Sequence, residues 1–172
     1  LDYFESYSPV VSITSLRIVL AYAAHHGMRV HGVDIVSAFL TGTEDCEIYM
    51  EVPDGFKPRN QQEMKIWKRS GPKALKLQKA IYGLVQAGHL FNKMLFDYRL
   101  QIGFKQLKTD GCVFTCEKKR KVVLAIFVDD ICICFHDKTD LLWILNALMS
   151  KFKIKHGGPL RQILGMELDT DD

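Results

Sequence analysis

The chain has 172 residues, of which 48% are hydrophobic and 25% are charged. This mixture is typical of one packed globular domain and excludes a disordered, collagen-like or coiled-coil chain. The net charge of +3 permits a nucleic-acid partner without arguing for one.

The first half of the chain contains one helical pattern and several short strand patterns. Apolar residues recur at spacings of three and four over residues 14–26, Ser12 or Thr14 can cap the start, and Gly27 follows the end, as in an amphipathic helix. After it we expect a strand over residues 28–35, a turn over 37–40, a strand over 47–51 and, within the polar segment 57–73, a strand near 65–68.

The second half alternates strands and helices. The predicted elements are a helix over residues 85–101, β-rich runs over 112–117 and 121–135, a helix that Asp137 caps, and a strand over 163–168. Strand, helix, two strands, helix and strand in this order predict an α+β fold, an antiparallel sheet with helices on one face.

Cysteine usage and hydropathy indicate the compartment. The five cysteines are odd in number and lie mostly inside hydrophobic stretches, which favours free buried thiols over a disulfide framework. No apolar run approaches the roughly 20 residues that cross a bilayer, and the first residues show no signal-peptide pattern. We therefore expect an intracellular protein without a membrane span.

Two adjacent carboxylates interrupt the most hydrophobic run of the chain. Seven apolar residues precede Asp129 and Asp130, and five apolar residues follow them. A strand buried on both faces cannot hold two adjacent anions without a large free-energy cost, and neighbouring like charges raise each other's pKa. We expect a tight turn that brings the pair to the sheet edge, with a divalent cation between them and another carboxylate.

Asp34 is the best candidate for the third carboxylate, because it follows Val33 at the end of the strand predicted over residues 28–35. Taken alone, it is explained equally well as an Asx-turn cap. Three carboxylates at one sheet edge suit two magnesium ions about 3.5–4 Å apart, which activate an attacking hydroxyl and hold a leaving pyrophosphate. The chemistry that this pattern predicts is phosphoryl or nucleotidyl transfer.

Six sequence blocks resemble, in order, the reverse transcriptase domain of copia-type (Pseudoviridae) LTR retrotransposons. They are SYSPVVSITSLRIVLAYAAHHG, HGVDIVSAFLTG, EIYMEVPDGF, LQKAIYGLVQAGHLF, FVDD and GPLRQILGMEL. They are similar to that family's entry segment and first helix, first catalytic motif, following segment, LYGLKQA block, YVDD box and the segment leading into the primer grip. The blocks cover nearly the whole chain, and their order makes the match specific.

The resemblance implies a polymerase palm with part of the fingers, and it assigns the metal site. Asp34, Asp129 and Asp130 are the implied ligands of two Mg²⁺ ions, for which Mn²⁺ can substitute. Asp34 and Asp129 would bridge the ions and Asp130 would support them.

Two more positions are implied to contact the incoming nucleotide. Phe39 falls where the family has its steric gate, the aromatic ring that rejects a ribose 2′-hydroxyl; without the motif, Phe39 reads as a core residue. Gln86 falls at a position that contacts the nucleotide and the template; without the motif, it reads as a polar residue near a helix start.

The last implied positions lie near the C-terminal end of the sequence. Lys155 is near the position of the lysine that protonates pyrophosphate, and it also contributes to the implied nucleotide-binding set. Lys153 competes for that role, and either lysine can instead be a solvated charge. Leu164 and Gly165 lie in the implied primer grip, where a close approach of backbone to the primer favours glycine.

The chain departs from the family pattern at four positions. Val85 stands where members usually carry Lys, Gly88 and His89 stand where they carry Pro-Arg, and Phe127 replaces the Tyr before Val-Asp-Asp. The resemblance further implies a single domain over residues 1–172, with the basic fingers segment upstream and the thumb, connection and RNase H regions downstream.

The expected function is templated addition of deoxynucleotides to a primer 3′-hydroxyl by a domain of a Pol polyprotein. The implied partners are an RNA or DNA template with its primer, deoxynucleoside triphosphates and other polyprotein regions such as RNase H and integrase, in the cytoplasm within virus-like particles or in the nucleus. One alternative is a catalytically silent domain that acts as a nucleic-acid-binding or scaffold module. Another is a nucleotidyl cyclase, which the lack of glycine-rich signatures disfavours.

Overall fold

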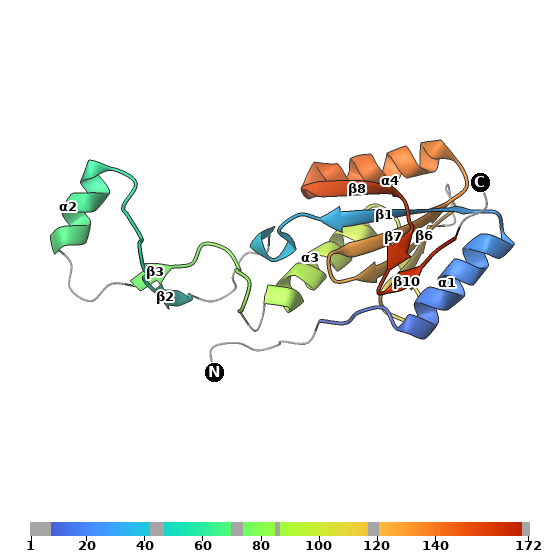
Figure 1. Cartoon of the computed structure of the whole chain (residues 1–172), viewed down its shortest axis with the longest axis horizontal. Coiled ribbons are helices and arrows are strands. Elements are labelled where there is room, and N and C mark those ends of the chain that lie inside the picture. Colours follow the sequence, from blue (N-terminus) through green and yellow to red (C-terminus); the bar gives the residue numbers. More distant parts are fainter. Residues whose placement is uncertain (1–7, 42–46, 70–73, 85–86, 117–120, 170–172) are drawn as a thin grey trace.

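The computed structural model describes residues 8–41, 47–69, 74–84, 87–116 and 121–169. Six strands form one antiparallel sheet in the order β4-β5-β6-β7-β1-β8 (Figure 1). They are β1 (Arg29–Ile35), β4 (Lys105–Gln106), β5 (Val113–Cys116), β6 (Val122–Phe127), β7 (Asp130–Phe135) and β8 (Ile154–Pro159). The predicted α+β class and the antiparallel sheet are confirmed.

The remaining elements are helices and two small hairpins. The helices are α1 (Ile13–His25), α2 (Gln61–Arg69), α3 (Ala87–Gln101) and α4 (Lys138–Lys151), with a short 3₁₀ helix, η1 (Ala38–Thr41). The hairpins pair β2 (Tyr49–Glu51) with β3 (Ala74–Lys76), and β9 (Gln162–Ile163) with β10 (Met166–Glu167).

Both faces of the central strands are apolar, and each face has its own cover. On β6, Leu124 and Ile126 belong to a core that includes Leu95 of α3 and Ile144 of α4. Ala125, between them, belongs to a second core with buried residues of α1 and β9. The prediction that the helices lie on one face is therefore wrong, because strands that are apolar on both sides need two covering layers. We call the two sides the α3–α4 face and the α1 face.

Helix α1 confirms the helix predicted over residues 14–26, with each end one residue earlier. The Ser15 N–H donates to the Ser12 hydroxyl at 3.0 Å, which caps the start. Gly27, with a φ of +60°, reverses the chain after the end. Leu16 and Ala23 are fully buried against the sheet, so the helix is held by its apolar stripe.

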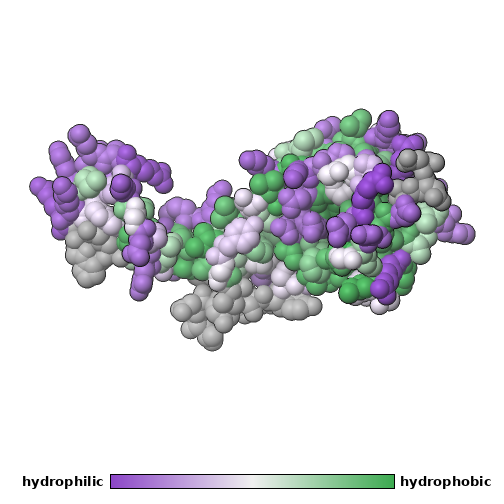
Figure 2. Space-filling model, in the orientation of Figure 1, coloured by the Kyte–Doolittle hydropathy of each residue, from purple (hydrophilic) through white to green (hydrophobic). Residues whose placement is uncertain are grey.

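The strand predicted near residues 65–68 is wrong, because this segment is helix α2. The Glu63 N–H donates to Asn60 Oδ1 at 2.8 Å, and the Arg59 N–H donates to the Glu63 carboxylate at 2.8 Å. These reciprocal bonds start a helix and outweigh the strand tendency of four residues. With β2 and β3, α2 forms a lobe that projects from the sheet (Figure 1) and is mostly hydrophilic at α2 (Figure 2).

The C-terminal region also differs from the prediction. The strand expected over residues 163–168 is the β9–β10 hairpin, because Leu164 and Gly165 have φ values of +48° and +75° and reverse the chain. Strand β8, which lies at the sheet edge beside β1, has a polar, glycine-containing sequence without a strand pattern. No helix within the described ranges is long and apolar enough to cross a bilayer.

Candidate active site

A two-residue turn carries the aspartate pair. Strands β6 and β7 end at the pair Phe127 and Asp130, so Val128 and Asp129 form the whole connection. Val128 has a φ of +57°, a conformation that two-residue hairpin turns require but that β-branched residues rarely adopt. The Ile35 N–H donates to the Asp129 carbonyl at 3.0 Å, which fastens the turn to the end of β1. The expected tight turn that lifts the carboxylates out of the buried run is therefore present.

The strand register brings Asp130, Asp34 and Lys155 into one row. Asp34 of β1 is directly opposite Asp130 of β7 on one side and Lys155 of β8 on the other. Residues directly opposite in an antiparallel pair project to the same face. This row lies on the α1 face, because the neighbours Val33, Ile35 and Ile131 point into the opposite core.

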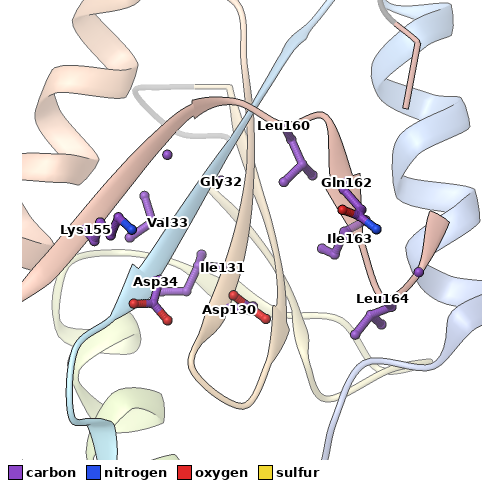
Figure 3. Close-up of a pocket in the computed structure, with 12 residues that line it drawn as sticks. Gly32, Val33, Asp34, Asp130, Ile131, Lys155, Leu160, Gln162, Ile163 and Leu164 are labelled. Atoms are coloured by element: carbon purple, nitrogen blue, oxygen red, sulfur yellow. The ribbon is translucent and has the colours of Figure 1, made fainter. Parts of the chain in front are cut away.

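A cavity of about 420 Å³ lies between this row and the β9–β10 hairpin. Asp34, Asp130, Lys155, Leu164 and Gly165, all of them singled out from the sequence, line it. Figure 3 shows the two carboxylates on neighbouring strands, with the hairpin residues across the cavity. Three parts of the chain that are far apart in the sequence, residues 32–34, 130–131 and 155–165, thus meet at one place.

The surroundings of Asp130 disfavour its charged form. Burial raises the pKa of Asp130 above its ordinary value, and the negative charges of Asp129 and Asp34 raise it further. A cation bound nearby would relieve this repulsion, because it neutralises the charge that the neighbours oppose.

The donor set fits a hard divalent cation, since carboxylate oxygens are the ligands that Mg²⁺ and Mn²⁺ prefer. Asp34 and Asp130 supply such oxygens in the cavity, while Asp129 is one residue away in the turn and does not line it. Within the described ranges, no three His, Cys, Asp or Glu side chains converge closely enough to hold one ion. The structure therefore brings two of the three predicted ligands into the cavity and leaves the third beside them.

Of Lys153 and Lys155, the two candidates for the lysine that protonates pyrophosphate, one lines the cavity and the other does not. Lys155 lines the cavity. Lys153 does not, and its carbonyl accepts the Val36 N–H at 2.8 Å beyond the end of β1. Of the two alternatives, Lys155 is the one that faces the aspartates.

Among the remaining predicted residues, Phe39 does not line the cavity. Phe39 lies in η1, half-buried, with its ring centroid 4.8 Å from that of Tyr82 and 6.2 Å from that of Phe91. The alternative prediction, that Phe39 is a core residue, is partly confirmed, because its half-buried side chain packs against the α3–α4 core. Gln86 lies outside the described residues.

Sequence reasoning missed Gly32 and Gln162, which also line the cavity. A Cβ atom on Gly32 would lie 2.8 Å from Cδ1 of Leu160, so the missing side chain is what lets the segment before the hairpin approach β1. A glycine inside a strand is a recognised sign of such close approach, so the sequence carried a signal for Gly32. No comparable signal marks Gln162.

Comparison with known proteins identifies the family of the chain. A family model for reverse transcriptase (RNA-dependent DNA polymerase) matches residues 1–172. The chain is 35% identical over 168 residues to the retrovirus-related Pol polyproteins from transposons RE2 and RE1 of Arabidopsis thaliana. It is 32% identical over 170 residues to the Pol polyprotein from transposon TNT 1-94 of Nicotiana tabacum.

These alignments cover 97–98% of the chain but only 11–12% of the three relatives, so the chain spans about a tenth of their length. No solved structure matches the chain significantly. The family match over every residue and the similarity to copia-type Pol polyproteins lead to one conclusion: the chain belongs to the reverse transcriptase (RNA-dependent DNA polymerase) family.

Proposed function

We propose that this chain carries the catalytic centre of an RNA-directed DNA polymerase, which extends a primer 3′-hydroxyl with deoxynucleotides along an RNA or DNA template. The observation that carries the proposal is the row Asp130–Asp34–Lys155, which faces one cavity beneath the β9–β10 hairpin. Adjacent carboxylates next to a cationic side chain suit phosphoryl transfer, where negative charge must be held at both the attacking and the leaving oxygen.

Asp34, Asp129 and Asp130 are the proposed ligands of the divalent cations. When bound, such cations would polarise the attacking hydroxyl and neutralise charge on the triphosphate. The chain's own contribution is to fix the carboxylates, which the Ile35 N–H bond to the Asp129 carbonyl at 3.0 Å supports. Because the row is made by strand register, its members have little freedom to separate.

Lys155 is the proposed proton donor to the pyrophosphate leaving group. Its place opposite Asp34 supports this role, since the ammonium group lies on the same face as the carboxylates. The β9–β10 hairpin, with Leu164 and Gly165 at its turn, is the proposed contact for the primer strand. Phe39 and Gln86 are the proposed contacts for the sugar and base of the incoming nucleotide.

The sheet with α1, α3 and α4 would be the palm, and the lobe of β2, β3 and α2 would be part of the fingers. The charges of α2 support a nucleic-acid contact there, because its sequence QQEMKIWKR carries three cations and one anion. The proposed partners are a template with its primer, deoxynucleoside triphosphates and further regions of a Pol polyprotein.

Primer extension on an RNA template, with Mg²⁺ or Mn²⁺, tests this proposal. The Asp129→Asn variant should lose activity by at least about a hundredfold, because a missing ligand removes several kcal/mol of charge stabilisation. Asp97→Asn is the matched control. Asp97 is an exposed residue of α3, which packs against the other face of the sheet, and it does not line the cavity. This variant should extend the primer like the wild type.

Equal extension by Asp129→Asn and wild type would contradict the proposed ligand set. A second measurement is the affinity for a primer–template duplex, which Mg²⁺ should raise in the wild type and not in Asp129→Asn. Weak affinity that is indifferent to Mg²⁺, together with no extension, would instead indicate the catalytically silent alternative.

A further inference from the structure

A pair of histidines lies on the sheet face opposite the proposed active site. Nδ1 of His31 is 2.9 Å from Nε2 of His156, and the two rings stack with their centroids 5.1 Å apart. The His31 ring also packs nearly perpendicular to the Phe135 ring, at a centroid distance of 4.9 Å and an interplanar angle of 81°. The orientation of His31 is therefore held from two sides.

A bulge in the edge strand brings the two imidazoles together. The β1–β8 register passes from Gly32 opposite Gly158 to Val33 opposite His156, so Gly157 is one extra residue in β8. His31 is two residues from Val33 and shares its face, which makes His31 and His156 diagonal neighbours within reach of long side chains. Lys155, the next residue, points to the other face with Asp34.

The pair has the chemistry of a transition-metal site. Only one proton fits between the two facing nitrogens, so at least one imidazole must be neutral. Burial lowers the pKa of His31, and the positive charges of His156 and Arg29 lower it further. Neutral imidazole nitrogen binds Zn²⁺, Ni²⁺ and Cu²⁺ well and suits Mg²⁺ poorly.

The spacing of the two nitrogens is close to what a shared ion needs. With metal–nitrogen bonds of about 2.0–2.1 Å in a tetrahedral arrangement, two ligand nitrogens lie about 3.3 Å apart. The observed 2.9 Å would open by a few tenths of an ångström, and each of the two partly exposed rings would turn by about 35° so that its nitrogen lone pair points at the ion instead of along the line between the nitrogens.

We propose that His31 and His156 form a binding site for a divalent transition metal such as Zn²⁺, with water in the remaining positions. No third His, Cys, Asp or Glu among the described residues completes the site, so the affinity should be micromolar rather than that of a structural zinc centre. The bound ion clamps the edge strand β8 to β1. This inference does not depend on polymerase activity.

Thermal unfolding of the whole chain with Zn²⁺ alone as the probe tests the site, in buffer with excess Mg²⁺ to occupy the carboxylates. Zn²⁺ at ten times its dissociation constant should raise the melting temperature of the wild type by about 4 °C. His156→Gln keeps a polar side chain but lacks a good zinc ligand, so this rise should disappear. His26→Gln, at the end of α1, should leave it unchanged.

Two further measurements do not depend on the folding of His156→Gln. In the wild type, Zn²⁺ should shift the imidazole NMR signals of His31 and His156 together, with one midpoint, before those of the other histidines. Arg29→Gln should tighten Zn²⁺ binding a few-fold, because it removes a positive charge close to His31. A zinc-induced rise that persists in His156→Gln, or signals that move first at other histidines, would overturn the proposal.

Discussion

Backbone strain gathers around the candidate active site. The non-glycine residues with positive φ in the described part of the chain are Ser37, Val128 and Leu164. Ser37 follows the strand that carries Asp34, Val128 precedes Asp129, and Leu164 lines the cavity. Such conformations cost of order 1–3 kcal/mol each, and they persist where the surroundings over-determine them, often at functional sites. At Val128, the hydrogen bond between Ile35 and Asp129 is one such constraint.

Val128→Gly should stabilise the protein. Glycine adopts positive φ without a clash, so relief of strain should exceed its extra loss of chain entropy and raise the free energy of unfolding by about 1 kcal/mol. Urea denaturation monitored by circular dichroism measures the change. Ser37→Gly, at a φ of +55°, should gain less, because serine is not β-branched. A loss of stability in Val128→Gly would show that the turn is not strained.

At the scale of elements, the approach of the segment before β9 to strand β1 shapes the cavity. The Leu160 N–H donates to the Val30 carbonyl at 2.9 Å, while Gly32, two residues further along β1, leaves room for the Leu160 side chain. The position of this cavity wall therefore depends on one hydrogen bond and on the absence of a side chain at Gly32.

Gly32→Ala should disturb this wall. Its Cβ atom would lie 2.8 Å from Cδ1 of Leu160, so the leucine must move, and we expect primer–template affinity to fall several-fold with a loss of stability of about 1 kcal/mol. Gly157→Ala is a control within the same cavity, because Gly157 also lines it but its Cβ would meet the Gly32 carbonyl at an ordinary 3.5 Å and would displace no side chain. Equal effects of the two variants on affinity would argue against a special role for Gly32.

At the scale of the whole molecule, the two apolar cores on opposite faces of the sheet bury four cysteine thiols. Cys112, Cys116, Cys132 and Cys134 are buried thiols that are not joined in disulfides, as the sequence led us to expect for most of the five. Burial raises the pKa of Cys112 to about 11, and the nearby charge of Asp110 acts in the same direction. Lack of access makes the four thiols unreactive in the folded state, and at Cys112 the disfavoured thiolate adds to this effect.

Thiol labelling therefore reports on the integrity of the whole fold. In a Cys46→Ser background, which removes the thiol outside the described residues, the four remaining groups should react with a disulfide reagent at pH 8 at least about a hundredfold more slowly than in urea. Time-resolved absorbance of the released thiolate measures this rate. Rapid labelling of any of the four in native buffer would mean that one face of the sheet is open.

Arg99 illustrates how the whole-molecule context can override a local pattern. An arginine near the end of a helix is ordinarily solvent-exposed, yet Arg99 is 2% exposed. Its Nε–H donates to the Leu95 carbonyl at 2.9 Å, and its guanidinium lies 3.9 Å from the centroid of the Phe114 ring. Burial lowers the pKa of Arg99 to about 9. Nothing in the local sequence distinguishes this arginine from a surface one.

The amino-acid sequence by itself determined the features that depend on neighbouring residues. Helix α1 followed from its spacing and its cap, and the Val128–Asp129 turn followed from the cost of burying two adjacent anions in an apolar strand. Only the tertiary structure decided the row Asp130–Asp34–Lys155, because strand register joins Asp34 to residues about 95 and about 120 positions away and a shift by one residue would reverse every side chain. It also decided which face each helix covers, since a strand that is apolar on both sides offers either face equally well.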